Sequence, residues 1–308
     1  MSVPLVTARG LVKRFGDFVA VDGIDFEIAA GEAFGFLGPN GAGKTSTMRM
    51  IAATSPLDGG ELRVLGLDPA AEGSAIRARI GVVPQEDNLD MELTVAENLY
   101  IYGRYFDLPR RVILRRIDEL LDFAQLAERR DARVESLSGG MKRRLTIARG
   151  LMNDPELVLL DEPTTGLDPQ ARHALWDRLY RLKRRGVTLI ITTHYMDEAE
   201  QLCDRLVVMD RGRIVAEGSP RDLIARYSTP EVVELRFRPE VDVGAPSRFA
   251  DMAQRVEILP DRVLLYTGDA DATVAKVEPM EELLDGFLVR RATLEDVFLH
   301  LTGRSLVD

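Results

Sequence analysis

A glycine-rich segment early in the chain has the residue types and spacing of a phosphate-binding loop: Gly, any four residues, Gly, Lys, then Ser or Thr. It runs Gly38-Pro39-Asn40-Gly41-Ala42-Gly43-Lys44-Thr45, and Ser46 follows. The glycines let successive backbone N–H groups point at phosphate oxygens, and a helix N-terminus adds partial positive charge. Lys44 would add a full charge for the outer phosphates, and Thr45 would offer a hydroxyl to Mg²⁺.

Two acidic residues end an apolar run farther along the chain. Leu157-Val158-Leu159-Leu160 is typical of a buried parallel strand, and Asp161 and Glu162 follow it directly. Such a strand delivers its last residues to the ligand crevice at the carboxyl edge of the sheet. Two carboxylates there are costly unless a cation lies nearby, and Mg²⁺ beside Lys44 would meet that need. We assign Asp161 to the metal side and Glu162 to the attacking water.

Three single residues carry weaker signals. Phe15 precedes a turn and could stack on a nucleotide base or pack in a core. Gln85 follows a short strand at 80–83, where it could reach Mg²⁺ or the attacking water or be an ordinary loop amide. His194 ends the apolar strand at 188–193 and could hydrogen-bond a phosphate or serve a structural role. On pattern alone these alternatives stay open.

A second helix start is predicted at Ser138-Gly139-Gly140-Met141. Ser138 is a good N-cap, and the two glycines would bring backbone N–H groups close to a docked anion. Simple capping is the alternative, and the basic triplet at 142–144 could be only the exposed side of that helix. Asp168 precedes Pro169 at the start of another helix, which ends near Gly186.

The elements that must position these residues fall into two parts. Residues 1–227 alternate short apolar strands with helices, and a helical insert occupies about 90–155. A polar linker with Pro230 follows, and residues 231–308 form a separate domain. There, strands at 232–237, 262–267 and 287–291 with helices at 249–255 and 272–284 predict a β-α-β-α-β unit. Thr293 then caps a last amphipathic helix.

Composition excludes several classes of protein. The chain has 308 residues, 45% of them hydrophobic, and a formal net charge of −10, which argues against a broad nucleic-acid surface. Cys203 is the single cysteine, so an intramolecular disulfide is impossible and a reducing cytoplasm is the expected compartment. No apolar run approaches the ~20 residues that span a bilayer, and the first ten residues lack a signal-peptide core. Membrane association is therefore expected to go through a partner.

Taken in chain order, these pieces resemble the motif set of ATP-binding cassette (ABC) ATPases, over about residues 5–220. The matching pieces are Gly38 to Thr45, Gln85, Leu137 to Met141, Leu157 to Glu162, Asp168 and His194. The resemblance implies an α/β fold: a P-loop NTPase core with an N-terminal antiparallel β subdomain, an inserted helical subdomain and a small C-terminal α+β accessory domain. It also implies that the chain binds ATP and Mg²⁺ and hydrolyses ATP.

The resemblance assigns roles to single residues. Phe15 would stack on adenine, a place usually held by tyrosine. Glu162 would be the catalytic carboxylate, with Lys44, Gln85 and His194 as the other catalytic residues. Thr45, Gln85 and Asp161 would face the metal. The full set of nucleotide-binding residues comprises Phe15, Gly38, Pro39, Asn40, Gly41, Ala42, Gly43, Lys44, Thr45, Ser46, Gln85, Ser138, Gly139, Gly140, Asp161, Glu162, Asp168 and His194.

A finer resemblance is to exporter ATPases of the nodulation-factor and daunorubicin type. It rests on the stretches 82–90, 141–144 and 294–304. Members of that group pair with a separate membrane permease of the ABC-2 type, so a peripheral position on the cytoplasmic side of the membrane is implied. The resemblance also implies that two ATPase copies bind head to tail, so that each phosphate loop would face the partner copy's segment at 138–140. Met141 replaces the usual glutamine there, which removes one polar contact.

Two other functions stay open at this point. A soluble ABC ATPase that acts on ribosomes or DNA usually carries two cassettes or a long coiled coil, whereas this chain has one cassette and an acidic balance. A regulatory module that holds ATP without turnover would not need Glu162 and His194. The cargo is also open, among a drug, a lipo-oligosaccharide and a polysaccharide.

Overall fold

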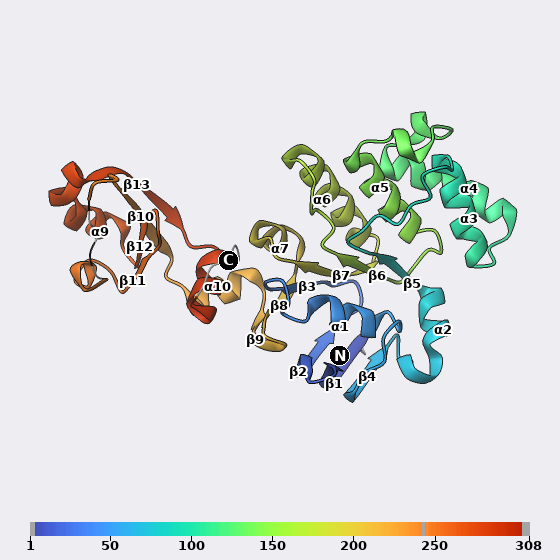
Figure 1. The fold of residues 1–308 in the computed structure, drawn as a ribbon, viewed down its shortest axis with the longest axis horizontal. Coiled ribbons are helices and arrows are strands. Elements are labelled where there is room, and N and C mark those ends of the chain that lie inside the picture. The colour runs from blue at the N-terminus through green and yellow to red at the C-terminus, as the bar shows by residue number, and fades with distance from the viewer. Residues whose placement is uncertain (1–3, 242–243, 245, 304–308) are drawn as a thin grey trace. The chain divides into compact units, whose positions relative to one another are not determined.

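The computed structural model describes residues 4–241, 244 and 246–303 and divides into two compact units (Figure 1). The first unit comprises Met1–Ser219 and the second Pro220–Asp308. The sequence placed the division later, between residues 227 and 231. Helix α8 (Pro220–Tyr227) belongs to the second unit because it packs on α10 (Leu294–Thr302).

A six-stranded sheet forms the centre of the first unit, in the order β5-β6-β7-β3-β8-β9. Five of its strands are parallel, and β9 runs antiparallel to β8. Every residue of β3 and β7 is buried, as expected for strands covered on both faces. The strands are β3 (Ala33–Leu37), β5 (Ile80–Val83), β6 (Leu157–Asp161), β7 (Thr188–Thr193), β8 (Arg205–Asp210) and β9 (Arg213–Gly218).

An antiparallel three-stranded sheet confirms the predicted β subdomain, with the order β2-β1-β4. Its strands are β1 (Val6–Phe15), β2 (Phe18–Ile28) and β4 (Gly59–Val64). Ile24, Phe26 and Ile28 are buried and alternate with more exposed residues, as predicted. Phe26 packs edge-on against Phe36 of β3, with ring centroids 5.2 Å apart, so the two sheets share one hydrophobic core.

The helices of the first unit include the predicted insert between β5 and β6 (Figure 1). A capping box of Thr94 and Glu97 starts α3, as the sequence predicted. Helix α2 was not predicted, because few of its residues are buried and no apolar stripe marks it. The helices are α1 (Lys44–Ile51), α2 (Pro69–Arg79), α3 (Val95–Tyr105), α4 (Arg110–Ala124), α5 (Gly139–Gly150), α6 (Pro169–Arg184) and α7 (Met196–Leu202).

The second unit is built on a four-stranded antiparallel sheet, in the order β11-β12-β10-β13. One face packs on α9 and two 3₁₀ turns, and α8 and α10 contribute to the core on the other face. Its other elements are β10 (Glu231–Phe237), η3 (Pro246–Phe249), β11 (Arg255–Ile258), β12 (Val263–Thr267), α9 (Ala270–Val277), η4 (Glu278–Leu283) and β13 (Leu284–Arg291).

The predicted β-α-β-α-β order of this unit is wrong at its first helix. The helix expected at 249–255 is a 3₁₀ turn that ends at Phe249, and strand β11 follows it. Phe249 and Met252 do pack on the core at helical spacing, but the residues that follow, from Arg255, form β11 and pair with β12. The helix expected at 272–284 is present as α9 up to Val277 and continues as the 3₁₀ helix η4 to Leu283, before Leu284 opens β13. Across the described residues, no helix combines the length and hydropathy of a membrane span.

Candidate nucleotide site

The phosphate loop leaves the buried strand β3 and enters α1, and its glycines are needed for two different reasons. Gly41 and Gly43 have φ of 82° and 101°, a region that favours glycine. A Cβ on Gly38 would stand 2.3 Å from the Met209 carbonyl oxygen, and one on Gly43 would stand 2.4 Å from that of Ala20. Strands β8 and β2 therefore hold the loop against their backbones.

Lys44 lies almost wholly inside this loop, with 4% of its surface exposed. Its Nζ donates to the carbonyl oxygens of Gly38 at 2.6 Å and Pro39 at 3.0 Å, and it lies 3.8 Å from Glu162 Oε1. Burial lowers the pKa of Lys44, and the negative charges of Glu162 and Asp161, which raise it, offset this effect only in part. Its charge is therefore only loosely balanced within the chain, which suits a residue that binds an anion.

The Glu162 carboxylate gathers the predicted catalytic residues around it. Its Oε2 accepts hydrogen bonds from Gln85 Nε2 at 3.1 Å and from Thr165 Oγ1 at 3.2 Å. His194 Nδ1 lies 3.1 Å from Oε1, without the alignment of a hydrogen bond. Glu162 is buried and has a left-handed φ of 46°, a strained backbone for a residue with a Cβ. The structure thus brings Lys44, Gln85, Glu162 and His194 into one cluster.

Asp161 lies beside the first turn of α1. Its Oδ1 accepts hydrogen bonds from Thr45 Oγ1 at 3.3 Å and from the Thr192 hydroxyl. Thr45, Gln85 and Asp161, the residues predicted to face the metal, all line a cavity of about 370 Å³. Their hydroxyl, amide and carboxylate oxygens are the hard donors that Mg²⁺ takes, together with water and phosphate oxygens. The donor set therefore fits Mg²⁺.

Phe15 is not a core residue, because 54% of its surface is exposed. It lies at the β1–β2 turn opposite Phe18, and Lys13 Nζ is 5.3 Å from its ring centroid. Two residues beyond Phe18 on β2, the Ala20 carbonyl meets the phosphate loop. An exposed aromatic ring thus stands at the end of the strand pair whose β2 strand contacts the loop.

Ser138 and Asp168 both cap helices. Ser138 Oγ accepts from Met141 N at 3.3 Å at the start of α5, and Asp168 Oδ1 accepts from Ala171 N at 2.8 Å at the start of α6. A Cβ on Gly139 would meet no atom within 4 Å. Within the described residues, no hydrogen bond joins Ser138–Gly140 to the phosphate loop. The N-terminus of α5 is therefore open to a ligand from outside.

Comparisons with known proteins agree with this geometry. The model of the ABC transporter family matches residues 21–165, and that of the C-terminal domain of the nodulation factor export protein NodI matches 243–303. The chain is 47% identical, over 100% of its own length and 96% of the relative, to Nod factor export ATP-binding protein I of Ralstonia nicotianae. The protein of that name from Paraburkholderia xenovorans is 48% identical over 96% of each chain.

This chain belongs to the ABC transporter ATP-binding proteins.

Solved structures of ABC cassettes confirm the predicted fold. The dimeric post-hydrolysis state of the cassette MJ0796, bound to ADP and Pi, has a TM-score of 0.64 at 26% identity, over 70% of this chain and 98% of that one. The cbiO1 protein of Clostridium perfringens, part of the transporter complex cbiONQ, has a TM-score of 0.67 at 29% identity, over 72% of this chain and 91% of that one. The expected α/β core, β subdomain, helical insert and ATPase family are thus established for this chain.

Sequence reasoning did not single out Arg143 of this ABC ATPase, and left open that the basic triplet at 142–144 is only the exposed side of the helix. Arg143 is buried, and its guanidinium joins the segment of Gln85 to that of Glu162. The available signal was spacing, since Arg143 precedes buried Ile147 by one helical turn. Arg143 donates to five carbonyl oxygens: Pro163 at 2.8 Å, Pro84 at 2.5 Å, Gln85 at 3.1 Å, Asp161 at 3.0 Å and Glu162 at 3.1 Å.

Glu198 is a second buried group that the sequence did not single out. It lies on α7, just after His194, and burial raises its pKa to about 7. Thr193, Thr164 and Trp176 are its polar neighbours and partly oppose this shift, but neither of its oxygens has an aligned hydrogen bond among the described residues. Glu198 thus packs between the segments that carry Glu162 and His194.

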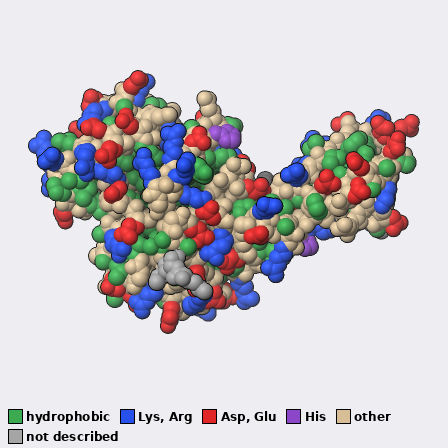
Figure 2. All heavy atoms as spheres, turned by 180° about the vertical axis from the view of Figure 1, so that it is seen from behind, with side chains coloured by type: hydrophobic (Ala, Val, Ile, Leu, Met, Phe, Trp, Pro, Cys, Tyr) green, Lys and Arg blue, Asp and Glu red, His purple; other side chains and the backbone are tan. Residues whose placement is uncertain are grey.

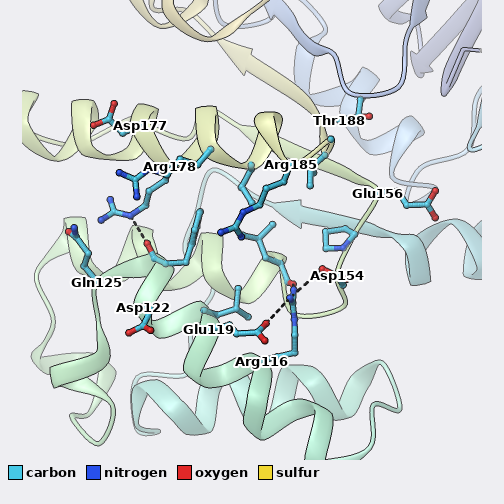
Figure 3. A pocket seen from close by; sticks show the side chains of 18 of the residues that line it. Arg116, Glu119, Asp122, Gln125, Asp154, Glu156, Asp177, Arg178, Arg185 and Thr188 are labelled. Carbon is cyan, nitrogen blue, oxygen red and sulfur yellow. Dashed lines mark hydrogen bonds and ion pairs between the residues drawn. The ribbon is translucent and has the colours of Figure 1, made fainter. Parts of the chain in front are cut away.

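A larger cavity, of about 930 Å³, lies away from this chemistry (Figure 3). Glu156 and Thr188 line it, and they stand at the amino ends of β6 and β7, whereas the phosphate loop follows a carboxyl end. Arg116 and Glu119 pair across its wall at 3.2 Å, and Arg178 Nε donates to the Phe123 carbonyl at 2.6 Å. Parallel sheets bind ligands at their carboxyl ends, so the smaller cavity is the nucleotide-site candidate.

Proposed function

We propose that this chain is the ATP-hydrolysing subunit of an exporter and works as a head-to-tail dimer on a separate membrane permease of the ABC-2 type. The cargo would be a drug, a lipid-linked compound or an oligosaccharide. The observation that carries the proposal is the buried cluster of Glu162 with Lys44, Gln85 and His194 at the phosphate loop. The relatives named for Nod factor export support the direction of transport.

Binding of ATP would use the loop from Gly38 to Ser46 for the phosphates and the exposed ring of Phe15 for adenine. The γ-phosphate would offer Lys44 a full negative charge in place of the carbonyl oxygens that it contacts now. Thr45, Gln85 and Asp161 would hold Mg²⁺, which when bound neutralises charge on the phosphates. The hard oxygen donors along this cavity support that assignment.

Hydrolysis would begin when Glu162 turns from Lys44 to the attacking water. A phosphate that neutralises Lys44 removes the attraction that holds Glu162 there, and the like charges of phosphate and carboxylate repel each other. Glu162 would then orient the water and accept its proton. Lys44 and His194 would stabilise the charge that develops on the transferred phosphoryl group.

A second copy would complete the site from the other side. The open helix N-terminus at Ser138–Gly140 would meet the partner's γ-phosphate, with Asp168 nearby on the partner-facing loop. The dimeric form of the MJ0796 cassette supports this arrangement. The permease would hold the dimer at the cytoplasmic side of the membrane. The acidic balance of the chain, and the intermingled acids and bases on the face in Figure 2, do not favour nucleic acid as a partner.

Glu162→Gln tests this function, because it keeps the shape of the side chain and removes its charge. ATP hydrolysis should fall by roughly 10²- to 10⁴-fold, as for loss of a general base, while ATP binding persists. Sizing with ATP and Mg²⁺ should then show a trapped dimer. Adding Ser138→Arg should block that dimer and leave ATP binding by the monomer intact. The measurement is repeated on the complex with the permease, and hydrolysis there at the unmodified rate would refute the assignment.

A further inference from the structure

Strand β13, at one edge of the sheet in the second unit, exposes large apolar side chains on both of its faces. Phe287, Leu288 and Val289 are 49%, 55% and 42% exposed. Phe287 and Val289 lie opposite Leu235 and Val233, on the face that packs on α9, and Leu288 lies on the other face. Consecutive exposed apolar residues on an edge strand are usually avoided, because they invite pairing with another strand.

The free edge of β13 has no partner strand within the described part of this unit. Strand β10 pairs with one edge of β13, and the sheet ends there. The strand has eight residues and no proline, and its pairing with β10 is regular from Gly286 to Arg291, with a bulge at Asp285. An exposed apolar edge of this length is a ready template for pairing with another strand.

The charges of β13 favour a second copy of the same strand in antiparallel direction. Asp285 stands near one end and Arg291 at the other, and both are exposed without an ion pair among the described residues. Antiparallel pairing brings opposite ends together, so each Asp285 can meet an Arg291 of the second copy. Parallel pairing would place like charges side by side, which is destabilising.

Symmetry fixes the register. The two-fold axis of an antiparallel edge-to-edge pair is perpendicular to the sheet, so residues that face each other must point to the same side of it. Opposed residue numbers then differ by an even number. With Leu288 opposite Leu288, Phe287 faces Val289 and Gly286 faces Arg290 in the regular part of the strand, and Asp285, at the bulge, comes next to Arg291. A shift to either neighbouring symmetric register removes the Asp285–Arg291 pairs.

We propose that β13 of one copy pairs with β13 of a second copy, centred on Leu288, and joins their second units in one continuous sheet. This contact buries the apolar residues of both strands and needs no nucleotide. It is therefore independent of the ATP-dependent dimer in the proposed function, and each can fail without the other.

Disulfide cross-linking of the full-length chain tests the register. Opposed antiparallel residues have Cα atoms ~4.5–5.5 Å apart, which a disulfide can span. Leu288→Cys should therefore form a covalent dimer under mild oxidation, without nucleotide and equally in a Lys44→Ala background. The native Cys203 is buried and gives little background. Val289→Cys is the matched control, because its symmetry mates would lie beyond disulfide reach, and Val215→Cys on edge strand β9 reports random collisions.

A charge exchange gives a second, non-covalent measurement. Asp285→Arg and Arg291→Asp should each weaken nucleotide-free self-association by roughly tenfold in analytical ultracentrifugation, and the double variant should restore it. The proposal is overturned if Leu288→Cys cross-links no more than its two controls, or only with ATP, or to the permease. Failure of the double exchange to restore association overturns it as well.

Discussion

Two buried clusters of charged residues, one in each unit, differ in how completely their charges are matched. In the second unit, Asp296 is 1% exposed and receives Arg290 through two bonds, at 2.7 and 2.9 Å. Tyr266 donates to it at 3.0 Å and the Thr293 N–H at 2.8 Å. Burial alone would raise the pKa of Asp296, but Arg290 and the Thr293 N–H reverse the effect, so the pKa is lowered.

The nucleotide site of the first unit lacks such saturation. Lys44 lies 3.8 Å from the nearest Glu162 oxygen, and its other contacts are neutral carbonyl groups. Burial leaves its pKa lowered, in contrast to Arg290, whose pKa is raised by its bond with Asp296. A cluster in which every buried charge has a hydrogen-bonded partner of opposite charge stabilises the fold. A cluster in which a cation lacks such a partner, beside a loop of N–H groups, is suited to binding an anion.

Substitution of the cation in each cluster should separate the two roles most strongly. Arg290→Ala leaves Asp296 buried and unpaired, which should cost about 3–5 kcal/mol of unfolding free energy with nucleotide affinity retained by the folded fraction. Lys44→Ala should abolish ATP binding and leave the second unit unchanged. Chemical denaturation and titration with a fluorescent ATP analogue measure both quantities. Equal loss of ATP affinity in the two variants would contradict this division of roles.

Glu198 should add a pH dependence to the stability of the first unit. Its pKa of about 7 in the folded chain exceeds that of an unfolded glutamate, so the folded state keeps a proton that the unfolded state has lost. Unfolding free energy should therefore fall as pH rises from about 4.5 to 7. Glu198→Gln stays neutral and should gain about 2–3 kcal/mol over the unmodified chain between pH 5 and 8.

Denaturation curves at pH 5 and pH 8 measure this gain. The matched control is Glu128→Gln, since Glu128 is an exposed acid that should follow the unmodified chain at both pH values. A constant difference between Glu198→Gln and the unmodified chain across this range would show that Glu198 is ionised throughout.

Phe15 should give the smallest of these effects. Phe15→Ala removes a stacking surface worth ~1–3 kcal/mol, so ATP affinity should fall by roughly 5- to 150-fold while turnover at saturating ATP changes less. Phe18 is the control, because it faces Phe15 across the turn and is equally open to solvent. Phe18→Ala should bind ATP normally, and equal losses in both variants would assign the effect to the turn itself.

The features that could be predicted from the sequence are those that depend on residues close together in the chain. The phosphate loop could be recognised because its residue types and spacing form a pattern within eight consecutive residues, although Gly38 and Gly43 are also required by contacts with β8 and β2. The acids after β6 could be placed because strand ends meet at one sheet edge. The spacing of Arg143 from Ile147 indicates its burial, but its role and that of Glu198 could not be predicted, because they depend on carbonyl groups and burial from distant segments. Strand β11 was missed since its neighbours around Phe249 imitate a helical period.

The close contacts of Gly38 and Gly43 with the backbones of Met209 and Ala20 have a consequence for the kinetics of binding. Fixing one residue's backbone costs ~1–2 kcal/mol of conformational entropy, and in this loop folding has already met that cost. An incoming triphosphate therefore finds its N–H donors in place and need not wait for the loop to order. Association should accordingly be limited by diffusion and orientation, and differences in affinity among loop variants should appear as differences in the rate of nucleotide release.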